Sequence, residues 1–285
     1  MRILVTGATG FIGTALIEEL STVQNYEIYA LSRVLRKDTP FVKYIVGDLN
    51  DRKFICNLQD FKFKRVYHLG WEGLPDRSEN FSNLNLENSK NLLNIFAKSK
   101  EIEFDIIGSC LEFGNSTGLA ENFEIPKGGN PFADAKLELN KYVKSLKVKF
   151  RWYRPFYVYG EGQGSNSLIP SIIYKLKNND EGSVRINSLN SSHDFISVSD
   201  VAKAISVSSA MPNFFGEINV GTGELTNVGD IIRLIYSHYG YEFEKEYSKE
   251  FGLFTNSKRL RANTNWAPRY VGLAGMQEYL TTYQL

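Results

Sequence analysis

The chain has 285 residues and a net charge of +1, with 42% hydrophobic and 23% charged residues. These values are ordinary for a soluble globular protein of one domain plus a lobe, and the charge gives no electrostatic basis for binding nucleic acid or an anionic membrane. Two cysteines and three histidines do not suggest a disulfide framework or a zinc site, so a reduced, cytoplasmic protein without metal is expected. The chain begins in a strand pattern and has no apolar run of membrane-spanning length, so we expect no signal peptide and no membrane association.

The first half of the chain alternates short apolar runs with helical periodicity. Strands are predicted at 2–6, 26–31, 44–46, 65–69, 104–108 and 148–153, and helices at 11–20, 53–58, 80–99 and 134–145. Short connections between them imply right-handed crossovers and a parallel sheet with helices on both faces. The predicted fold class is therefore α/β, a Rossmann-type doubly wound parallel sheet.

The pattern is looser after residue 155, where a glycine-rich segment (160–164) and a polar segment (178–192) occur. Helices are predicted at 168–177, 200–210, 228–239 and 273–283. We expect residues 1–155, with parts of 185–225, to form the dinucleotide-binding domain. Residues 156–285 are expected to form a smaller α/β lobe that binds the substrate.

Three glycines at three-residue spacing, Gly7, Gly10 and Gly13, lie between the first strand and the first helix. A turn without Cβ atoms lets backbone N–H groups approach a pyrophosphate, and the helix N-terminus stabilises its charge. This strand and helix context supports a dinucleotide-binding turn over an ordinary strand–helix connection. The predicted cofactor contacts here are Gly7, Thr9, Gly10, Phe11, Ile12 and Gly13.

The end of the second strand bears on the choice between NAD and NADP, because an acidic residue there binds the ribose hydroxyls and repels a 2′-phosphate. This chain has Ser32 and Arg33 at that point and no carboxylate until Asp38. Arg33 is suited to pair with a phosphate, so NADP(H) is favoured and NAD stays possible. The alternative is a solvated basic loop. Asp48 and Leu49, after the third strand, are candidate adenine contacts, and an ordinary strand end is the alternative.

Further motifs follow in a characteristic order. They are His68-Leu69-Gly70, Asn85 to Leu93 in a helix, Gly108 to Gly114 around Ser109, Arg154-Pro155 with Val158-Tyr159-Gly160, His193 to Ile196 with Asp200-Val201-Ala202, and Asn265 to Pro268. With the glycine turn, this order over residues 1–270 resembles the extended short-chain dehydrogenase/reductase family of NAD(P)-dependent nucleotide-sugar epimerases, dehydratases and reductases. His193 departs from the arginine that this family carries there.

The resemblance implies a Rossmann domain, a lobe that binds a nucleotide-diphosphate sugar, and hydride transfer at a sugar carbon, often C4. It adds Leu69, Gly70, Asn85, Lys136 and Pro155 to the cofactor contacts. It also implies a homodimer through the helices at 80–99 and 134–145.

The catalytic positions contain one mismatch. The family uses Ser or Thr, Tyr, and Lys four residues after the Tyr on the same helix face, and these positions are Ser109, Phe132 and Lys136. The family's Tyr is the general acid or base, its pKa lowered by the Lys, which also binds the nicotinamide ribose. A phenyl ring cannot exchange a proton, and loss of a positioned general acid costs on the order of 10² to 10⁴ in rate. Ser109 through water, Cys110 and Glu112 are the alternative proton sources.

Three explanations for Phe132 compete: an engineered inactivating substitution, an enzyme that uses another acid, or a binding protein that has lost catalysis. We favour the first, because the other site motifs are intact. A shifted alignment is not supported, since Tyr142 and Tyr153 have no Lys four residues later.

The substrate is expected to lie at the carboxyl edge of the sheet. The candidate contacts are Trp71, Glu72, Ser109, Cys110, Tyr157, Ser167, Leu168, Arg185 and Arg259. The alternatives stay open. Trp71 and Tyr157 could instead pack in the core, Glu72 could lie on the surface, and the arginines could bind no ligand. His193 is expected to be structural.

We therefore expect an NADP(H)-dependent nucleotide-sugar oxidoreductase, in particular a 4-ketoreductase of a nucleotide-linked 4-keto-6-deoxysugar for surface polysaccharide synthesis. The alternatives are an NAD-dependent 4-epimerase and a catalytically silent NAD(P)-binding protein. A dehydratase is less favoured, because Cys110 and Leu111 replace the Asp-Glu pair that the family's dehydratases carry.

Overall fold

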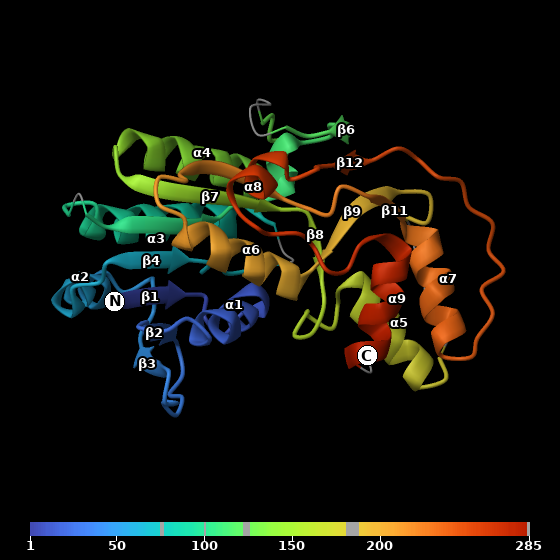
Figure 1. Ribbon diagram of the computed structural model, residues 1–285, viewed down its shortest axis with the longest axis horizontal. Coiled ribbons are helices and arrows are strands. Elements are labelled where there is room, and N and C mark those ends of the chain that lie inside the picture. The colour runs from blue at the N-terminus through green and yellow to red at the C-terminus, as the bar shows by residue number, and fades with distance from the viewer. Residues whose placement is uncertain (75–76, 100, 122–125, 181–187, 284–285) are drawn as a thin grey trace.

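In the computed structural model the chain forms a seven-stranded sheet beside a smaller lobe (Figure 1). The structure describes residues 1–74, 77–99, 101–121, 126–180 and 188–283. The sheet order is β10-β7-β5-β4-β1-β2-β3, and each neighbouring pair is parallel. The strands are β1 (Arg2–Thr6), β2 (Glu27–Ser32), β3 (Val42–Val46), β4 (Arg65–His68), β5 (Glu103–Ile107), β7 (Lys149–Pro155) and β10 (Gly216–Val220). This order and direction confirm the predicted doubly wound α/β fold.

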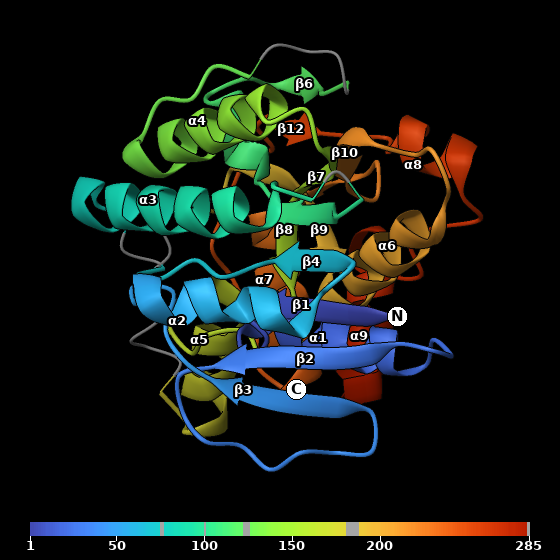
Figure 2. The same cartoon turned by 90° about the vertical axis from the view of Figure 1, so that its left-hand side faces the viewer.

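Helices cover both faces of this sheet (Figure 2). One face carries α2 (Arg52–Asn57), α3 (Glu79–Phe96) and α4 (Pro131–Ser145), and the other carries α1 (Phe11–Ser21) and α6 (Val198–Ala210). Each face has its own apolar core. Leu86, Leu93 and Leu139 are buried on the first face, and Leu16 and Val201 on the second. The strands are therefore buried on both sides, which explains why most of their residues are hydrophobic, although Asp105, Arg151 and Arg154 are also buried in them.

The lobe is built around three helices, α5 (Leu168–Lys177), α7 (Val228–His238) and α9 (Gly272–Tyr283), which share one apolar cluster. A small sheet of β11 (Leu225–Asn227), β9 (Ser192–Ser197) and β8 (Tyr157–Tyr159) joins the lobe to the large sheet. β12 (Leu253–Phe254) pairs with β6 (Gly118–Leu119), and α8 (Lys258–Asn263) precedes α9. The described part of the chain also contains the short 3-10 helices η1 (Leu58–Phe61) and η2 (Cys110–Phe113).

Three helices differ most from the prediction: α8 was not predicted, α3 ends at Phe96 instead of residue 99, and α4 begins earlier than expected. The sequence pattern predicts a start at residue 134, but the helix begins at Pro131. Asn130 caps it through Oδ1, which accepts the Ala133 N–H at 3.0 Å, and proline suits the first helical position. The earlier start places Phe132 in the first turn, four residues before Lys136. The sequence analysis did not predict β9 or β10, whose polar residues interrupt the apolar pattern.

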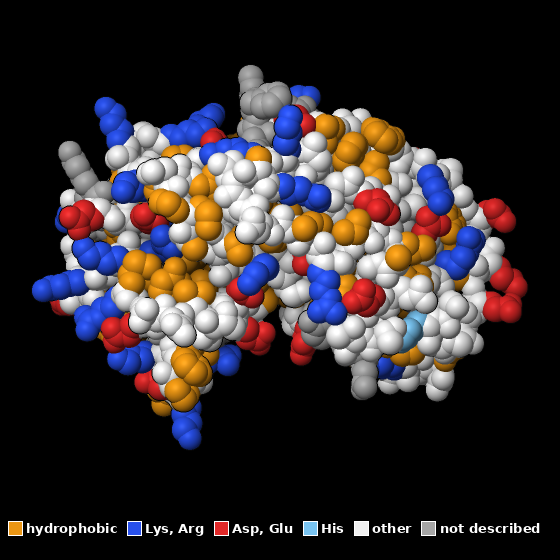
Figure 3. All heavy atoms as spheres, viewed as in Figure 1, with side chains coloured by type: hydrophobic (Ala, Val, Ile, Leu, Met, Phe, Trp, Pro, Cys, Tyr) orange, Lys and Arg blue, Asp and Glu red, His pale blue; other side chains and the backbone are white. Residues whose placement is uncertain are grey.

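Among the described residues, no helix has both the length and the apolar character to cross a membrane. The same part of the chain contains no group of three or more His, Cys, Asp or Glu side chains suited to a metal ion. On the face shown in Figure 3, basic and acidic side chains are interspersed.

Candidate active site

The candidate site lies along the carboxyl edge of the seven-stranded sheet. Because neighbouring strands are parallel, the segments that follow β1, β2, β3, β4, β5 and β7 all leave the sheet at this edge. They bring the glycine turn, Arg33, Asp48, the 69–72 segment, Ser109 and Tyr157 to one side of the molecule. Ligands of open α/β sheets bind at this edge.

The glycine turn is held tightly against the segment after β4. Gly7 has a φ of +66°, and a Cβ there would lie 2.6 Å from the Gly70 nitrogen. A Cβ on Gly13 would lie 2.0 Å from the Gly7 carbonyl oxygen. Any side chain at either position would therefore move the turn away from β4 or the helix away from the turn.

The N-terminus of α1 lacks the usual side-chain cap. Gly10 is its N-cap residue, and no side chain accepts its first N–H groups. The helix α5 has no side-chain cap either, whereas α2, α6 and α7 are capped by Asp51, Ser197 and Asn227. Exposed N–H groups with a helix dipole behind them form an anion site, so this end of α1 fits a pyrophosphate.

A chain of buried hydrogen bonds connects the turn to α3. Ser89 Oγ donates its proton to the Asn85 carbonyl at 2.6 Å, so its contact with His68 Nε2 at 2.8 Å must be one in which the imidazole donates. His68 Nδ1 then accepts from Thr6 Oγ1 at 2.7 Å, and Thr6 accepts the Gly70 N–H at 3.2 Å. Burial lowers the pKa of His68 to about 3, so the ring is neutral. A neutral ring, with one donor and one acceptor nitrogen, is what this series of hydrogen bonds requires. The imidazole positions the turn and is not an acid in the reaction.

Asn85 holds the segment after Gly70. Its Oδ1 accepts the Glu72 N–H at 2.7 Å, and its Nδ2 donates to the Glu72 carbonyl at 2.9 Å and the Phe81 carbonyl at 2.7 Å. The amide thus contacts protein backbone through both of its polar atoms. Asn85 also lines the pocket beside the glycine turn, but its observed hydrogen bonds hold the loop that follows Gly70.

A pocket of about 200 Å³ follows this edge from the glycine turn to the ends of β2 and β3. It is lined by Gly7, Thr9, Gly10, Leu31, Ser32, Arg33, Gly47, Asp48, Leu49, Asn50, Gly70, Trp71, Glu72, Asn85 and Asn88. The structure therefore groups most of the predicted cofactor residues around one cavity. Its volume is below the roughly 300–1,000 Å³ of sites for drug-sized ligands, so it fits part of a dinucleotide.

Arg33 and Glu72 form an ion pair in the wall of this pocket. Sequence analysis assigned Glu72 to the sugar, but the structure places it with the predicted cofactor residues. Asp48 Oδ1 accepts from the backbone and side chain of Asn50, at 2.8 and 2.9 Å. Asp48 and Leu49 lie in the pocket wall as predicted for adenine contacts, which stay a prediction.

Trp71 separates this pocket from Lys136. The Lys136 Nζ lies 3.7 Å from the centroid of the Trp71 ring and donates to the Ile107 carbonyl at 2.8 Å. Lys136 is 4% exposed. Burial lowers its pKa to about 7, because a desolvated ammonium is disfavoured. The amine can therefore gain or lose a proton near neutral pH.

Phe132 completes an aromatic wall around this amine. Its ring packs edge-to-face on Trp71, with centroids 5.5 Å apart, and its centroid lies 5.8 Å from the Lys136 Nζ. Phe132 is buried. The spacing predicted from the Phe-x-x-x-Lys segment is confirmed in space, and the position that a phenol would occupy carries only carbon.

Ser109 follows β5 and begins η2. Its Oγ accepts the Leu111 N–H at 3.2 Å, and its own N–H donates to Glu112 Oε1 at 2.8 Å, which together form a capping box. The hydroxyl is thus positioned by the backbone at the edge where the substrate is expected.

Glu112 is fully buried beneath Ser109. Besides the Ser109 N–H, its carboxylate accepts Trp152 Nε1 at 3.0 Å and Arg154 Nε at 2.6 Å. The Ser109 N–H, the Trp152 indole and the Arg154 guanidinium therefore occupy the acceptor positions of this carboxylate. The geometry therefore argues against Glu112 as a substitute proton donor, and sequence reasoning missed its role because its partners lie about forty residues away.

Cys110 and Tyr157 lie near Ser109. Burial raises the pKa of the Cys110 thiol to about 12, which makes it a poor acid. Tyr157 stacks on His193, with centroids 3.8 Å apart, and burial also raises its pKa. His193 is thus a ring-packing partner, whereas the role predicted from the sequence was that of a structural hydrogen-bonding residue.

Some predicted residues are not brought to this site. Arg259 donates to the Glu217 and Phe215 carbonyls near the amino end of β10, the edge opposite the site, so the structure does not support its predicted contact with the diphosphate. Ser167 is the N-cap residue of α5 and Leu168 its first residue, and their substrate contacts stay predictions. Arg185 lies outside the described residues.

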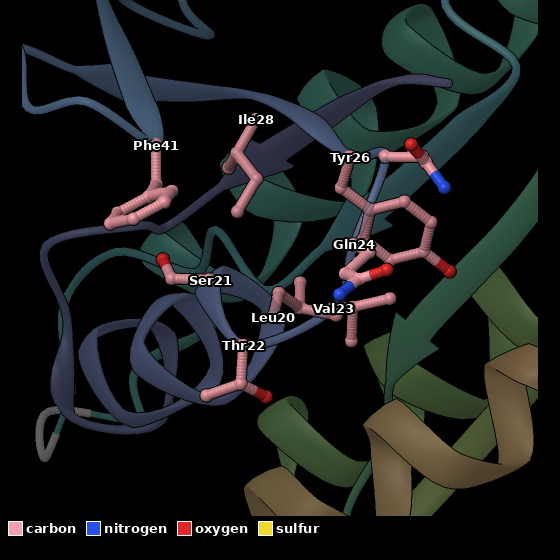
Figure 4. Close-up of a pocket in the computed structure, with 9 residues that line it drawn as sticks. Leu20, Ser21, Thr22, Val23, Gln24, Tyr26, Ile28 and Phe41 are labelled. Atoms are coloured by element: carbon pink, nitrogen blue, oxygen red, sulfur yellow. The ribbon is translucent and has the colours of Figure 1, made fainter.

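Another pocket, of about 410 Å³, lies at the amino edge of the sheet (Figure 4). It is lined by the end of α1 and the following turn, with Ile28 and Phe41. The residues that line it supply hydroxyl, amide and apolar side chains, and no carboxylate, amine or thiol side chain.

The site can now be set against known proteins. A model described as the NAD dependent epimerase/dehydratase family matches residues 3–221. The ADP-L-glycero-D-manno-heptose-6-epimerase of Cupriavidus pinatubonensis is 27% identical over 257 residues, which are 81% of this chain and 76% of that protein.

Solved structures of similar fold include two nucleotide-sugar epimerases. The UDP-glucose 4-epimerase of Thermotoga maritima, solved with UDP-glucose, has a TM-score of 0.85 and 19% identity, covering 100% of this chain and 99% of that one. The UDP-glucuronic acid 4-epimerase of Bacillus cereus, solved with UDP-glucuronic acid and NAD, has a TM-score of 0.82 and 22% identity, covering 99% and 98%. At these identities the likeness concerns the fold.

Proposed function

Because the chain belongs to the NAD-dependent epimerase/dehydratase family, we propose that it binds a nicotinamide dinucleotide and acts on the sugar of a nucleotide-diphosphate sugar. The observation that carries this proposal is the position of Lys136 and Ser109 at the sheet edge that also carries an uncapped α1 and a pocket along the glycine turn. The specific reaction that we propose is reduction of a nucleotide-linked 4-keto-6-deoxysugar, in a cytoplasmic route to surface polysaccharide.

The residues present fit the adenosine and pyrophosphate parts of the cofactor. The α1 N-terminus offers N–H groups to the pyrophosphate, and the 200 Å³ pocket would take the adenosine side. When bound, the nicotinamide would supply or accept the hydride. Since Trp71 lies between the pocket and Lys136, full occupation of the site would require this indole to change its position.

The protein's own residues would handle the proton. A carbonyl that receives a hydride needs a proton on its oxygen, and Phe132 cannot supply it. The Lys136 ammonium, with a pKa of about 7, can donate one directly or through a water molecule, and Ser109 can hydrogen-bond the same oxygen. The neutral amine left behind regains its proton from solvent.

Two other functions remain in competition. A 4-epimerase that uses NAD is favoured by Glu72, which adds a carboxylate to the cofactor pocket. A catalytically silent binding protein is favoured by Phe132. NADP(H), favoured from Arg33, is tested by the binding experiment of the next subsection, and the homodimer through α3 and α4 stays a prediction.

The test is oxidation of NADH and NADPH in the presence of nucleotide-linked 4-keto-6-deoxysugars, with the chain as given and with Phe132→Tyr. We expect the tyrosine to raise turnover on the order of 10² to 10⁴, because it restores a positioned general acid. Phe132→Leu is the matched control and should leave turnover unchanged.

If both forms bind a dinucleotide and neither turns over any sugar in the panel, the reductase proposal fails. Epimerisation of nucleotide sugars by Phe132→Tyr, without net oxidation of the cofactor, would then select the epimerase. Absence of both reactions would select the silent binding protein.

A further inference from the structure

The wall of the cofactor pocket brings together two charges that sequence reasoning kept apart. Arg33 follows β2, Glu72 follows β4, and their side chains form an ion pair although 39 positions separate them. Both residues line the pocket that contains Gly7 and Gly10. The sequence lacks a carboxylate directly after β2, but the fold delivers one to the same cavity from another strand.

Glu72 is the better anchored of the two. Its backbone N–H and carbonyl are both bound by Asn85, at 2.7 and 2.9 Å. Its side chain is 36% exposed, whereas that of Arg33 is 64% exposed. Arg33 begins a connection that contains no helix or strand before Val42. The carboxylate is therefore the less mobile partner, and the guanidinium approaches it from the more exposed side.

The pair affects the two forms of the cofactor differently. A carboxylate offers about four lone-pair positions, so Glu72 can accept a ribose hydroxyl while still bound to Arg33. A 2′-phosphate carries about −1.5 to −2 charges near neutral pH. To bind Arg33 it must displace Glu72, and it then lies beside an unpaired carboxylate of like charge.

We propose that Glu72 is the residue that selects the cofactor, by accepting a hydroxyl of the adenosine ribose and excluding a 2′-phosphate, with Arg33 orienting its carboxylate. The site then prefers NAD(H) over NADP(H), opposite to the expectation from Arg33 alone. This inference rests on the proposed function, since it requires that a dinucleotide binds in this pocket.

The test measures binding, without turnover. NADH and NADPH are titrated into the full chain, and dissociation constants are obtained from the fluorescence of the reduced nicotinamide or by calorimetry. We expect NADH to bind at least about tenfold more tightly than NADPH. Glu72→Gln should tighten NADPH at least about tenfold, because it removes the repulsion while retaining the shape of the side chain.

Two further variants serve as controls. Glu79→Gln removes the same charge at the start of α3, outside the residues that line the pocket, and should leave the ratio of the two constants unchanged. Arg33→Ala should weaken NADPH further, because Glu72 loses its counter-charge. Circular dichroism of each variant establishes that the fold is retained.

Two results would overturn the inference while leaving the proposed function intact. These are tighter binding of NADPH than NADH by the unmodified chain, and an unchanged ratio in Glu72→Gln. If neither NADH nor NADPH binds, the proposed function is refuted and this inference with it.

Discussion

Two buried charges near the same edge of the sheet have opposite surroundings. The Glu112 carboxylate receives three donors, including the Arg154 guanidinium, at distances of 2.6 to 3.0 Å. The Lys136 ammonium has one carbonyl and the face of an indole. Burial lowers the pKa of Lys136 to about 7. The difference separates two uses of a buried polar group. Glu112 is fully hydrogen-bonded and has a structural role, whereas Lys136 has few partners and its pKa lies near neutrality.

The largest expected effect is on the paired charge. Glu112→Ala leaves Arg154 buried without its partner and also removes the bond to the Ser109 N–H. We expect a loss of about 3–5 kcal/mol in the free energy of unfolding, measured by urea denaturation. Glu138→Ala, which breaks an exposed ion pair with Lys90, is the control and should cost below about 1 kcal/mol. If Glu112→Ala lost no more stability than Glu138→Ala, the structural role of Glu112 would be contradicted.

Lys136→Met tests the opposite case. The folded pKa is about 7 and the ordinary value is 10.5, so between these pH values the unfolded chain binds a proton that the folded chain does not. The free energy of unfolding of the chain with Lys136 therefore rises with pH across this range, by up to about 1.4 kcal/mol per pH unit. The destabilisation caused by the buried lysine is greatest below pH 7.

We expect Lys136→Met to be more stable than the original chain near pH 6 and to lose this advantage towards pH 10, as measured by denaturation at a series of pH values. Lys98→Met, at an exposed position beyond α3, should show no such trend. An advantage that does not vary with pH would mean that Lys136 has an ordinary pKa in the folded chain.

A smaller effect is expected from the aromatic partner. Trp71→Ala should let water reach the amine, and because burial is the main cause of the low pKa, the pKa should rise towards its usual value. Nitrogen-15 NMR of labelled lysine would record a titration midpoint about 1–2 pH units higher. Trp71→Phe keeps an aromatic face and should move the midpoint less. Equal midpoints in all three chains would show that Trp71 does not shield Lys136.

Prediction from sequence succeeded where the evidence was local. The glycine turn and the Phe-x-x-x-Lys spacing are each contained within eight residues, and the structure has both of these local geometries. Helical and strand periodicity likewise indicated six of the seven strands of the large sheet, all except β10, because most of their side chains are apolar and buried.

It was less successful where a side chain is used by a distant partner. Arg259, considered for the diphosphate, instead donates to carbonyls 42 and 44 residues away. Glu112, considered as a proton donor, is occupied by Trp152 and Arg154. In both cases charge and residue type suggested a role in binding or catalysis. The partner that each side chain has within the protein could not be recognised from the sequence pattern.

The sequence by itself determined the class of fold, the turn for a dinucleotide and the absence of a hydroxyl at Phe132, because these depend on short spacings and on single side chains. Only the tertiary structure decided that Trp71 covers Lys136 and that Glu72 reaches Arg33. The physical reason is the order of the parallel strands, which places the ends of β2 and β4 on either side of β1 and the ends of β4 and β5 beside each other. Residues far apart along the chain therefore share one cavity and contact one another.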